Sequence, residues 1–345
     1  MRILVTGAAG LIGGEICARF AARGHTVTGF VHTNRDVRAN DGAPAAIDHI
    51  VAGDLSQACG GLARAEWEAL ADDHDLLVHC AAVTRFDLEE AAYHATNIEG
   101  TRQALELAEL GGMDFLHIST AYVCGDRSGV IGESDPLPTG GFTNGYEASK
   151  AEAEKLVCES GLRYAIARPS IVVGASCDGA IRQFDTIYAA FKLIAEGRVR
   201  HMPVMPGATL DFVPLDHVAS AIVALAEDIP NAAGRVYHLV SGGPVAVEAF
   251  AEAIGSFSMF ESPRLVDAAG FDPSGLPAME RRLFRRVAGL YANYFQRDPR
   301  FDDAGLREVT GLAPPVMDQA MLRRLIQYCI DVGFLRAPEL QRTSG

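Results

Sequence analysis

Two side chains four residues apart, Tyr146 and Lys150, have the chemistry of a proton donor and its activating cation. If the segment opens a helix at Tyr146, both side chains lie on one face of that helix. A nearby ammonium group favours the phenolate, so Lys150 is expected to lower the pKa of Tyr146 from its usual value of about 10. A pKa near 7 would require roughly 4 kcal/mol of differential stabilisation. The pair predicts a general acid that works at neutral pH.

A pair of hydroxyl side chains, Ser119 and Thr120, follows a short apolar strand predicted over residues 115–118. The Tyr-x-x-x-Lys pattern alone is common in solvated helices. Its combination with hydroxyls at the end of a strand and with a glycine-rich turn near residue 7 favours a catalytic site.

That glycine-rich turn comes directly after a predicted strand over residues 2–5. Gly7 permits a tight turn, Gly10 lets backbone N–H groups approach a pyrophosphate, and Gly13 lets the next helix pack closely on the sheet. The N-terminus of that helix would then face the phosphates of a dinucleotide. The turn residues expected at the cofactor are Gly7, Ala9, Gly10, Leu11, Ile12 and Gly13.

The cofactor preference depends on the residues after the second predicted strand, at 26–31. An NAD-binding protein usually places an acidic residue here to hold the ribose 2′-hydroxyl. This chain has a basic, hydroxyl-bearing segment instead, with His32 and Arg35 as the nearest cations. The segment favours NADP(H), with NAD(H) as the alternative; a solvated loop with Arg35 in water is the structural alternative.

Strands and helices alternate through the first half of the chain, which predicts an α/β fold. The expected architecture is a Rossmann-type, doubly wound parallel sheet with helices on both faces. Ligands bind such sheets at the carboxyl ends of the strands. Residues expected there are Asp54 and Leu55, Ala81 and Ala82, and Pro169, together with Gly7 and Thr120.

Composition narrows the function further. A net charge of −14 over 345 residues argues against nucleic acid or an anionic membrane as the main partner. No run of residues is long and apolar enough to span a membrane, and no secretory signal precedes the first strand. The seven cysteines are scattered without metal-ligand spacing, so we expect no metal, reduced thiols and a cytoplasmic protein.

The character of the chain changes after Gly174. We expect a cofactor-binding domain over residues 1–174, to which residues 208–226 return, and a smaller, mainly helical substrate-binding region over residues 175–345. Asp216 is expected to cap the helix of the returning segment. Apolar residues at helical spacing predict a core helix that carries Phe184, Ile187, Tyr188, Phe191 and Ile194.

Four arginines form the densest basic cluster in the sequence: Arg281, Arg282, Arg285 and Arg286. On a helix their spacing gathers them on one flank. The cluster could attract the phosphates of coenzyme A or an acidic carrier protein, and a solvated helix face is the alternative.

Several motifs occur in a familiar order: TGAAGLIG, GDL, HCAAVTRFD, NIEGT, STAYVCG, YEASK and RPSIVVG. In order and spacing they resemble the extended short-chain dehydrogenase/reductases, and within them the branch of the fatty acyl-CoA reductases and thioester reductase domains. The resemblance covers about residues 1–240. It departs from that branch at Ala151, where an aromatic residue is common, and the last 100 residues match no pattern.

The resemblance implies a role for each matching residue. Tyr146 would donate the proton, and Lys150 would lower its pKa and hold the nicotinamide ribose. Thr120 would hydrogen-bond the substrate oxygen, with Ser119 as its substitute. Asn97 matches the structural asparagine near the cofactor. The residues that would lie against the nicotinamide carboxamide are Pro169, Ser170 and Ile171.

The expected function is an oxidoreductase that prefers NADP(H) and reduces an acyl thioester to an aldehyde or alcohol. Its partners would be a small-molecule substrate and coenzyme A or an acyl carrier protein, and a homodimer is compatible with the sequence. The alternatives are an alcohol or ketone dehydrogenase, a nucleotide-sugar epimerase or dehydratase, and a dinucleotide sensor without catalysis. A sugar-nucleotide enzyme needs a cation for the diphosphate; the candidates are Arg182, Lys192, Arg198 and Arg200.

Overall fold

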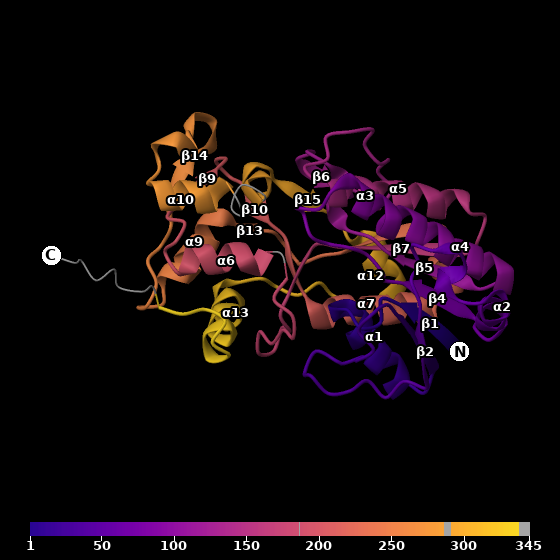
Figure 1. Ribbon diagram of the computed structural model, residues 1–345. Helices are drawn as coiled ribbons and strands as arrows, with labels where there is room; N and C mark the ends of the chain where they lie inside the picture. Colours follow the sequence, from indigo (N-terminus) through magenta and orange to yellow (C-terminus); the bar gives the residue numbers. More distant parts are fainter. Residues whose placement is uncertain (186, 286–290, 338–345) are drawn as a thin grey trace.

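A seven-stranded parallel sheet organises the molecule (Figure 1). The computed structural model describes residues 1–185, 187–285 and 291–337, so Arg286 of the arginine cluster lies outside the described residues. The strands lie in the order β3-β2-β1-β4-β5-β7-β12. In chain order they are β1 (Arg2–Thr6), β2 (Thr26–Val31), β3 (His49–Ala52), β4 (Leu76–His79), β5 (Asp114–Ile118), β7 (Tyr164–Pro169) and β12 (Arg235–Leu239).

Helices cover both faces of this sheet, which confirms the predicted fold class. One apolar cluster joins the sheet to α1 (Leu11–Ala22), α7 (Leu215–Glu227) and α12 (Ala304–Thr310). A second cluster joins the opposite face to α2 (Arg64–Asp72), α4 (Gly100–Gly111) and α5 (Gly145–Glu159). The strand order reverses between β1 and β4, and a crevice at this point is where such sheets bind ligands.

The sequence explains where α5 begins. Asn144 has extended backbone, and its side chain accepts a hydrogen bond from the Glu147 amide at 2.9 Å. This cap satisfies one of the amide groups that a helix start leaves without a partner. Tyr146 therefore stands in the first turn of α5 and Lys150 one turn later.

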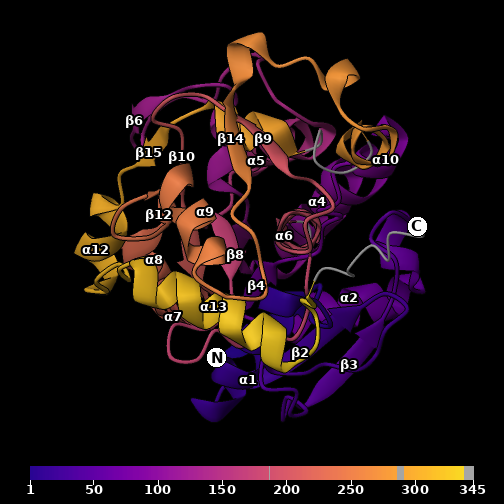
Figure 2. The same cartoon turned by 90° about the vertical axis from the view of Figure 1, so that its left-hand side faces the viewer.

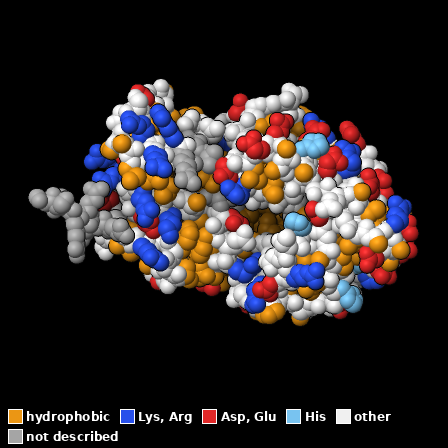
Figure 3. All heavy atoms as spheres, in the orientation of Figure 1, with side chains coloured by type: hydrophobic (Ala, Val, Ile, Leu, Met, Phe, Trp, Pro, Cys, Tyr) orange, Lys and Arg blue, Asp and Glu red, His pale blue; other side chains and the backbone are white. Residues whose placement is uncertain are grey.

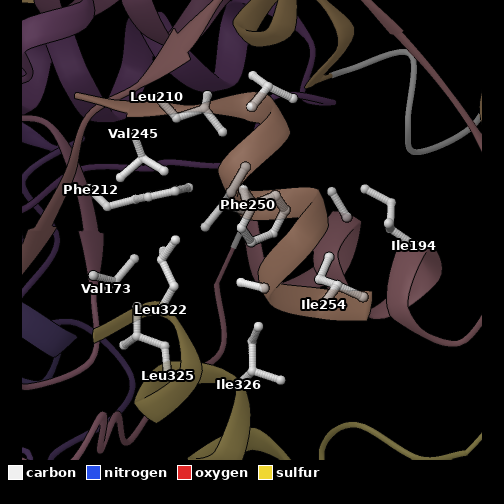
Figure 4. Close-up of a cluster of buried hydrophobic side chains, with 14 of the residues drawn as sticks. Val173, Ile194, Leu210, Phe212, Val245, Phe250, Ile254, Leu322, Leu325 and Ile326 are labelled. Carbon is white, nitrogen blue, oxygen red and sulfur yellow. The ribbon is translucent and has the colours of Figure 1, made fainter. Parts of the chain in front are cut away.

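A smaller lobe forms at the carboxyl edge of the sheet around its own apolar core (Figures 2 and 4). Three helices enclose this core: α6 (Ile187–Ala195), α9 (Val247–Gly255) and α13 (Gln319–Asp331). Figure 4 shows Phe212, Phe250 and Leu325 pointing into it from different segments. Short strand pairs connect its loops: β8 (Ile171–Val173) with β11 (Phe212–Pro214), β9 (His201–Val204) with β14 (Arg264–Asp267), β10 (Thr209–Leu210) with β13 (Val245–Ala246), and β6 (Gly129–Ile131) with β15 (Pro299–Phe301).

The remaining elements are short. They are η1 (Ala58–Gly61), α3 (Glu90–Tyr93), η2 (His94–Glu99), η3 (Ala121–Cys124), α8 (Ile229–Ala232), η4 (Ala268–Gly270), η5 (Pro273–Gly275), α10 (Ala278–Leu283) and η7 (Ala292–Gln296). Of these, η2 is a π-helical turn that joins α3 to α4.

Two local expectations were wrong, and one strand of the sheet was missed. Asp216 does not cap α7: it lies inside the first turn, and its carboxylate accepts hydrogen bonds from the Ser176 amide and hydroxyl. Phe184 precedes α6 instead of belonging to it, although its ring packs at 5.3 Å from that of Tyr188. The edge strand β12 was not expected.

Candidate active site

A cavity of about 290 Å³ lies at the carboxyl ends of the central strands. Figure 3 shows a hollow with apolar side chains at its floor between the two lobes. Its lining combines the glycine-rich turn, the hydroxyl pair, Tyr146 and an aromatic wall. The lining residues are Gly7, Gly10–Gly13, Cys80, Ala82, Thr84, Phe86, Ile118–Thr120, Tyr122, Tyr146, Pro169–Val172, Ile181, Gln183, Asp185, Ile187, Tyr188, Tyr291 and Tyr294.

The hydroxyl groups of Ser119, Thr120 and Tyr146 meet in this cavity, as the sequence predicted. Thr120 caps η3, where its hydroxyl accepts a hydrogen bond from the Tyr122 amide at 3.3 Å. The Ser119 hydroxyl is buried and has no hydrogen-bond partner among the described residues. Both hydroxyls can therefore donate to an oxygen atom placed beside Tyr146.

Burial raises the pKa of Tyr146 above its ordinary value, and the neighbouring Glu147 raises it further. A hydrogen bond with Thr120 acts in the opposite direction. The expected decrease in the pKa of Tyr146 is therefore absent from this geometry. The reason is that a buried phenolate loses hydration, and the Lys150 amino group contacts another residue.

That other residue is His117 on β5. The Lys150 Nζ lies 3.2 Å from His117 Nε2, and both side chains are buried. Burial lowers the pKa of Lys150 to about 8, while Glu154 counteracts this decrease. Burial and the Lys150 charge hold the pKa of His117 well below its usual range. A neutral His117 can therefore accept a hydrogen bond from the ammonium group and hold it beneath Tyr146.

Asn97 lies outside the cavity lining and contacts residues that adjoin it. Its side chain accepts from the Val83 amide at 2.8 Å and donates to the Ser149 hydroxyl at 2.9 Å. Ser149 in turn donates to the Tyr146 carbonyl. Asn97 thus ties the loop after β4 to the catalytic turn of α5, and it is not among the residues that line the cavity.

The glycine-rich turn fits a dinucleotide. A Cβ atom at Gly7 would lie 2.7 Å from the Ala81 amide nitrogen, and one at Gly13 would lie 2.2 Å from the Gly7 carbonyl oxygen. Gly7 also has a φ of 66°, in the left-handed region that favours glycine. Ala82 lines the same cavity, and the Ala81 amide donates to Thr6 Oγ1. The close approach leaves the start of α1 open to a phosphate group.

The other predicted cofactor residues divide into two groups. Pro169, Ser170 and Ile171 line the cavity, and the Ser170 hydroxyl donates to Asp211 at 2.5 Å. Ala9 and Leu55 pack against apolar clusters on opposite faces of the sheet.

His32, Arg35 and Asp54 lie outside the lining of the cavity. His32 and Arg35 are exposed, and His32 lies 3.7 Å from Asp54. The Asp54 carboxylate accepts hydrogen bonds from its own loop, namely from Ser56 and Gln57, which lowers its pKa.

An aromatic wall faces Tyr146 and was missed from the sequence. The Phe86 ring stacks 5.9 Å from the Tyr146 ring and lies 5.4 Å from Tyr291 and 5.7 Å from Tyr294. Tyr291 and Tyr294 belong to an apolar pattern at helical spacing, which predicts a helix but does not show that the helix faces the cavity. Among the described residues, no Lys or Arg lines the cavity.

A buried ion pair joins this aromatic wall to α5. Arg297 donates to Glu147 at 2.8 Å and to the Gly125 carbonyl, and its guanidinium packs over the adjoining rings of Tyr122 and Tyr294. The Tyr294 hydroxyl donates to the same carboxylate at 3.0 Å. Glu147 directly follows Tyr146 in α5. The same carboxylate therefore holds the aromatic wall close to Tyr146.

Neither a metal site nor a membrane span is found within the described ranges. No group of His, Cys, Asp or Glu side chains there could hold a metal ion, and all seven cysteines are free. None of the described helices is both long and apolar enough to cross a bilayer.

Comparison with known proteins identifies the family. The model of the male sterility protein family, an NAD-binding domain, matches residues 5–222. The chain belongs to this family. Its relatives include a ketoreductase of Stigmatella aurantiaca that acts on 4-hydroxy-2-methyl-3-oxo-4-farnesyl-3,4-dihydroquinoline-1-oxide, 30% identical over 72% of this chain and 71% of that protein. They also include fatty acyl-CoA reductase 1 of Rattus norvegicus, 30% identical over 50% of this chain and 40% of the rat protein.

Structural comparison gives the same answer for this member of the male sterility protein family. The terminal R domain of the myxalamid PKS-NRPS pathway is 26% identical, with a TM-score of 0.83 over 98% of this chain and 92% of that domain. The chain spans only 15 to 18% of the length of three other curated relatives, all reductases by name. The predicted resemblance is confirmed, and the protein is an NAD(P)-dependent oxidoreductase of the extended short-chain type.

Proposed function

We propose that the protein prefers NADP(H) and reduces the carbonyl group of an apolar acyl thioester to an aldehyde or an alcohol. The observation that carries the proposal is one cavity that joins the glycine-rich turn, a hydroxyl triad and an apolar aromatic wall. When bound, the cofactor supplies the hydride. A fatty acyl-CoA reductase and an R domain among the relatives support the thioester substrate.

The chain's own residues then perform the polar part of the reaction. Thr120 and Ser119 would hold the carbonyl oxygen through hydrogen bonds that strengthen as negative charge develops on it. Tyr146 would donate its proton to that oxygen, and Lys150 would hold the nicotinamide ribose, as the family resemblance implies. For a thioester, collapse of the hemithioacetal product would expel the thiol and release the aldehyde, which a second hydride could reduce to the alcohol.

The polarity of the cavity bears on the substrate class. A diphosphate needs cations, and no Lys or Arg in the described part of the chain lines the cavity. Of the four candidate cations, Lys192 and Arg198 bind Glu196, and Arg200 donates to the Gly197 carbonyl. The fourth, Arg182, donates to the Gly10 carbonyl of the glycine-rich turn, where the diphosphate of the cofactor and not that of a substrate would lie. These contacts favour an uncharged apolar carbonyl compound over a sugar nucleotide. Solved UDP-sugar epimerases with 18 to 20% identity share the fold alone.

We assign residues 1–174 and 208–226 to cofactor binding, together with β12 and α12, which complete the sheet and its helical cover. The rest of residues 175–345 is assigned to the substrate. The arginine cluster belongs to the second part: Arg281, Arg282 and Arg285 line an open hollow beside α10. Figure 3 shows many Lys and Arg side chains on this lobe. We infer that this surface receives the phosphates of coenzyme A or an acidic carrier protein.

A ketone reductase is the second candidate, because the Stigmatella aurantiaca ketoreductase matches more than two thirds of both chains. Consumption of NADPH and NADH should be followed with acyl-CoA thioesters, free aldehydes, ketones and sugar nucleotides. Turnover on thioesters supports the proposal. Turnover on ketones alone would favour the second candidate, and turnover on sugar nucleotides alone would refute both.

A substitution at the proton donor tests the chemistry. Tyr146→Phe keeps the ring and should lower turnover by about 10² or more, the usual scale for the loss of general acid catalysis, while cofactor binding survives. Tyr164→Phe, on β7 away from the cavity, is the matched control. Turnover of Tyr146→Phe within a few-fold of the control would contradict the assignment.

A further inference from the structure

Arg182 lies where a loop of the C-terminal lobe crosses the glycine-rich turn. This strap, residues 174–185, runs from the end of β8 towards α6, and Ile181, Gln183 and Asp185 line the same cavity as Gly7 and Gly10–Gly13. The Arg182 guanidinium donates to the Gly10 carbonyl at 3.0 Å. It therefore stands beside the first turn of α1.

The backbone of the strap is held without the Arg182 side chain. Asn40, from the loop after β2, accepts from the Arg182 amide at 2.9 Å and donates to the Ala180 carbonyl at 2.8 Å. The Asn40 amide donates to Glu15 on α1. Ser176 is anchored separately through Asp216. The guanidinium, which donates to the Gly10 carbonyl, takes no part in these bonds, and its removal leaves them intact.

The positive charge of Arg182 beside the start of α1 favours the binding of an anion. The start of a helix carries partial positive charge and unpaired amide groups, so a cation placed there is unfavourable unless a negative group joins it. Among the described residues, Arg182 has no ion pair within 4.0 Å, and its buried Nε has no hydrogen-bond partner. Two acids of the neighbouring segments have other partners: Glu15 pairs with Arg19 at 2.8 Å, and Asp185 accepts from Gln183.

We propose that Arg182, which lies beside the glycine-rich turn, binds the pyrophosphate of the dinucleotide. The turn supplies neutral backbone amides, and Arg182 adds the positive charge that they lack. A guanidinium can donate two parallel hydrogen bonds to a phosphate. The inference rests on cofactor binding at the turn and not on the identity of the substrate.

This assignment differs from a contact with a 2′-phosphate, which NADPH carries and NADH lacks. The pyrophosphate is common to both cofactors. Loss of Arg182 should therefore weaken both by the same factor, whereas loss of a 2′-phosphate ligand should weaken NADPH alone.

Direct binding, measured by isothermal titration calorimetry with NADPH and with NADH, tests the proposal without any substrate. Arg182→Ala should raise both dissociation constants about 10- to 100-fold, the effect of losing a hydrogen bond to a charged group. Arg182→Lys, which keeps a point charge, should recover part of the affinity. Arg64→Ala removes an equal charge from an exposed ion pair on α2 and should change neither constant.

An unchanged affinity for both cofactors, or a loss confined to NADPH, would overturn the assignment. These outcomes are independent of the proposed reaction. If the wild type binds cofactor but no thioester is reduced, the proposed substrate fails while the role of Arg182 stands.

Discussion

The buried ion pair between Arg297 and Glu147 should contribute strongly to stability, and Arg297→Met tests this. The side chains are 4% and 0% exposed, so loss of the guanidinium leaves a carboxylate in a dry site. Breaking a buried pair from one side costs about 3 to 5 kcal/mol. Glu147 keeps hydrogen bonds from the Thr143 amide and the Tyr294 hydroxyl, so we expect a loss near the lower end, about 3 kcal/mol.

The free energy of unfolding should be measured by urea denaturation for Arg297→Met, Glu147→Gln and the double variant. Because Glu147→Gln removes the orphaned charge, the double variant should be more stable than the sum of the single losses predicts, by about 2 kcal/mol. Arg23→Met breaks the exposed pair with Glu227 and should cost less than about 1 kcal/mol. A coupling energy as small as that surface loss would refute the reasoning.

Three further outcomes are expected. Arg35→Ala should weaken NADPH binding by about 1.5 to 3 kcal/mol in a binding titration and leave NADH binding nearly unchanged. Equal losses for both cofactors would show that Arg35 faces solvent or does some other work. Burial raises the pKa of Asp211 to about 6. Its contribution to stability is therefore present below about pH 4 and is lost as the pH rises through 6. Asp211→Asn should remove this decrease of the melting temperature with pH from thermal unfolding curves. Changing Arg281 and Arg285 to Glu should raise KM for a thioester, most steeply at low ionic strength, and leave kcat on a short aldehyde unchanged. An unchanged KM at low ionic strength would show that these arginines form a solvated helix face.

The parts of the site that the sequence predicted correctly depend on local chemistry. The glycine-rich turn can be recognised in the sequence because two of its positions require glycine. Gly7 has a left-handed backbone, and Gly13 lies close to the Gly7 carbonyl. Tyr146 could be placed beside the hydroxyl pair because helix spacing and the parallel sheet bring them to one edge.

The missed features depend on contacts between distant segments. The position of β12 is set by pairing with β7, and the aromatic wall is held by a residue 150 positions from its partner Glu147. The Lys150 contact with His117 depends on how α5 lies against β5. The turn from His94 to Glu99 is π-helical and so is wider than an α-helical turn. The spacing of apolar residues in the sequence does not predict this difference.

The bonds that Asn40 makes also bear on redesign of the cofactor preference. The loop that follows β2 is the usual target for exchanging NADP(H) and NAD(H), because it faces the ribose. Here the same loop holds the strap from the far lobe through two hydrogen bonds and α1 through a third. A graft of residues 32–43 from another protein would import new specificity only if it also reproduced this junction. Residues 32–43 and 174–185 therefore form one transferable unit, although 130 positions separate them in the sequence.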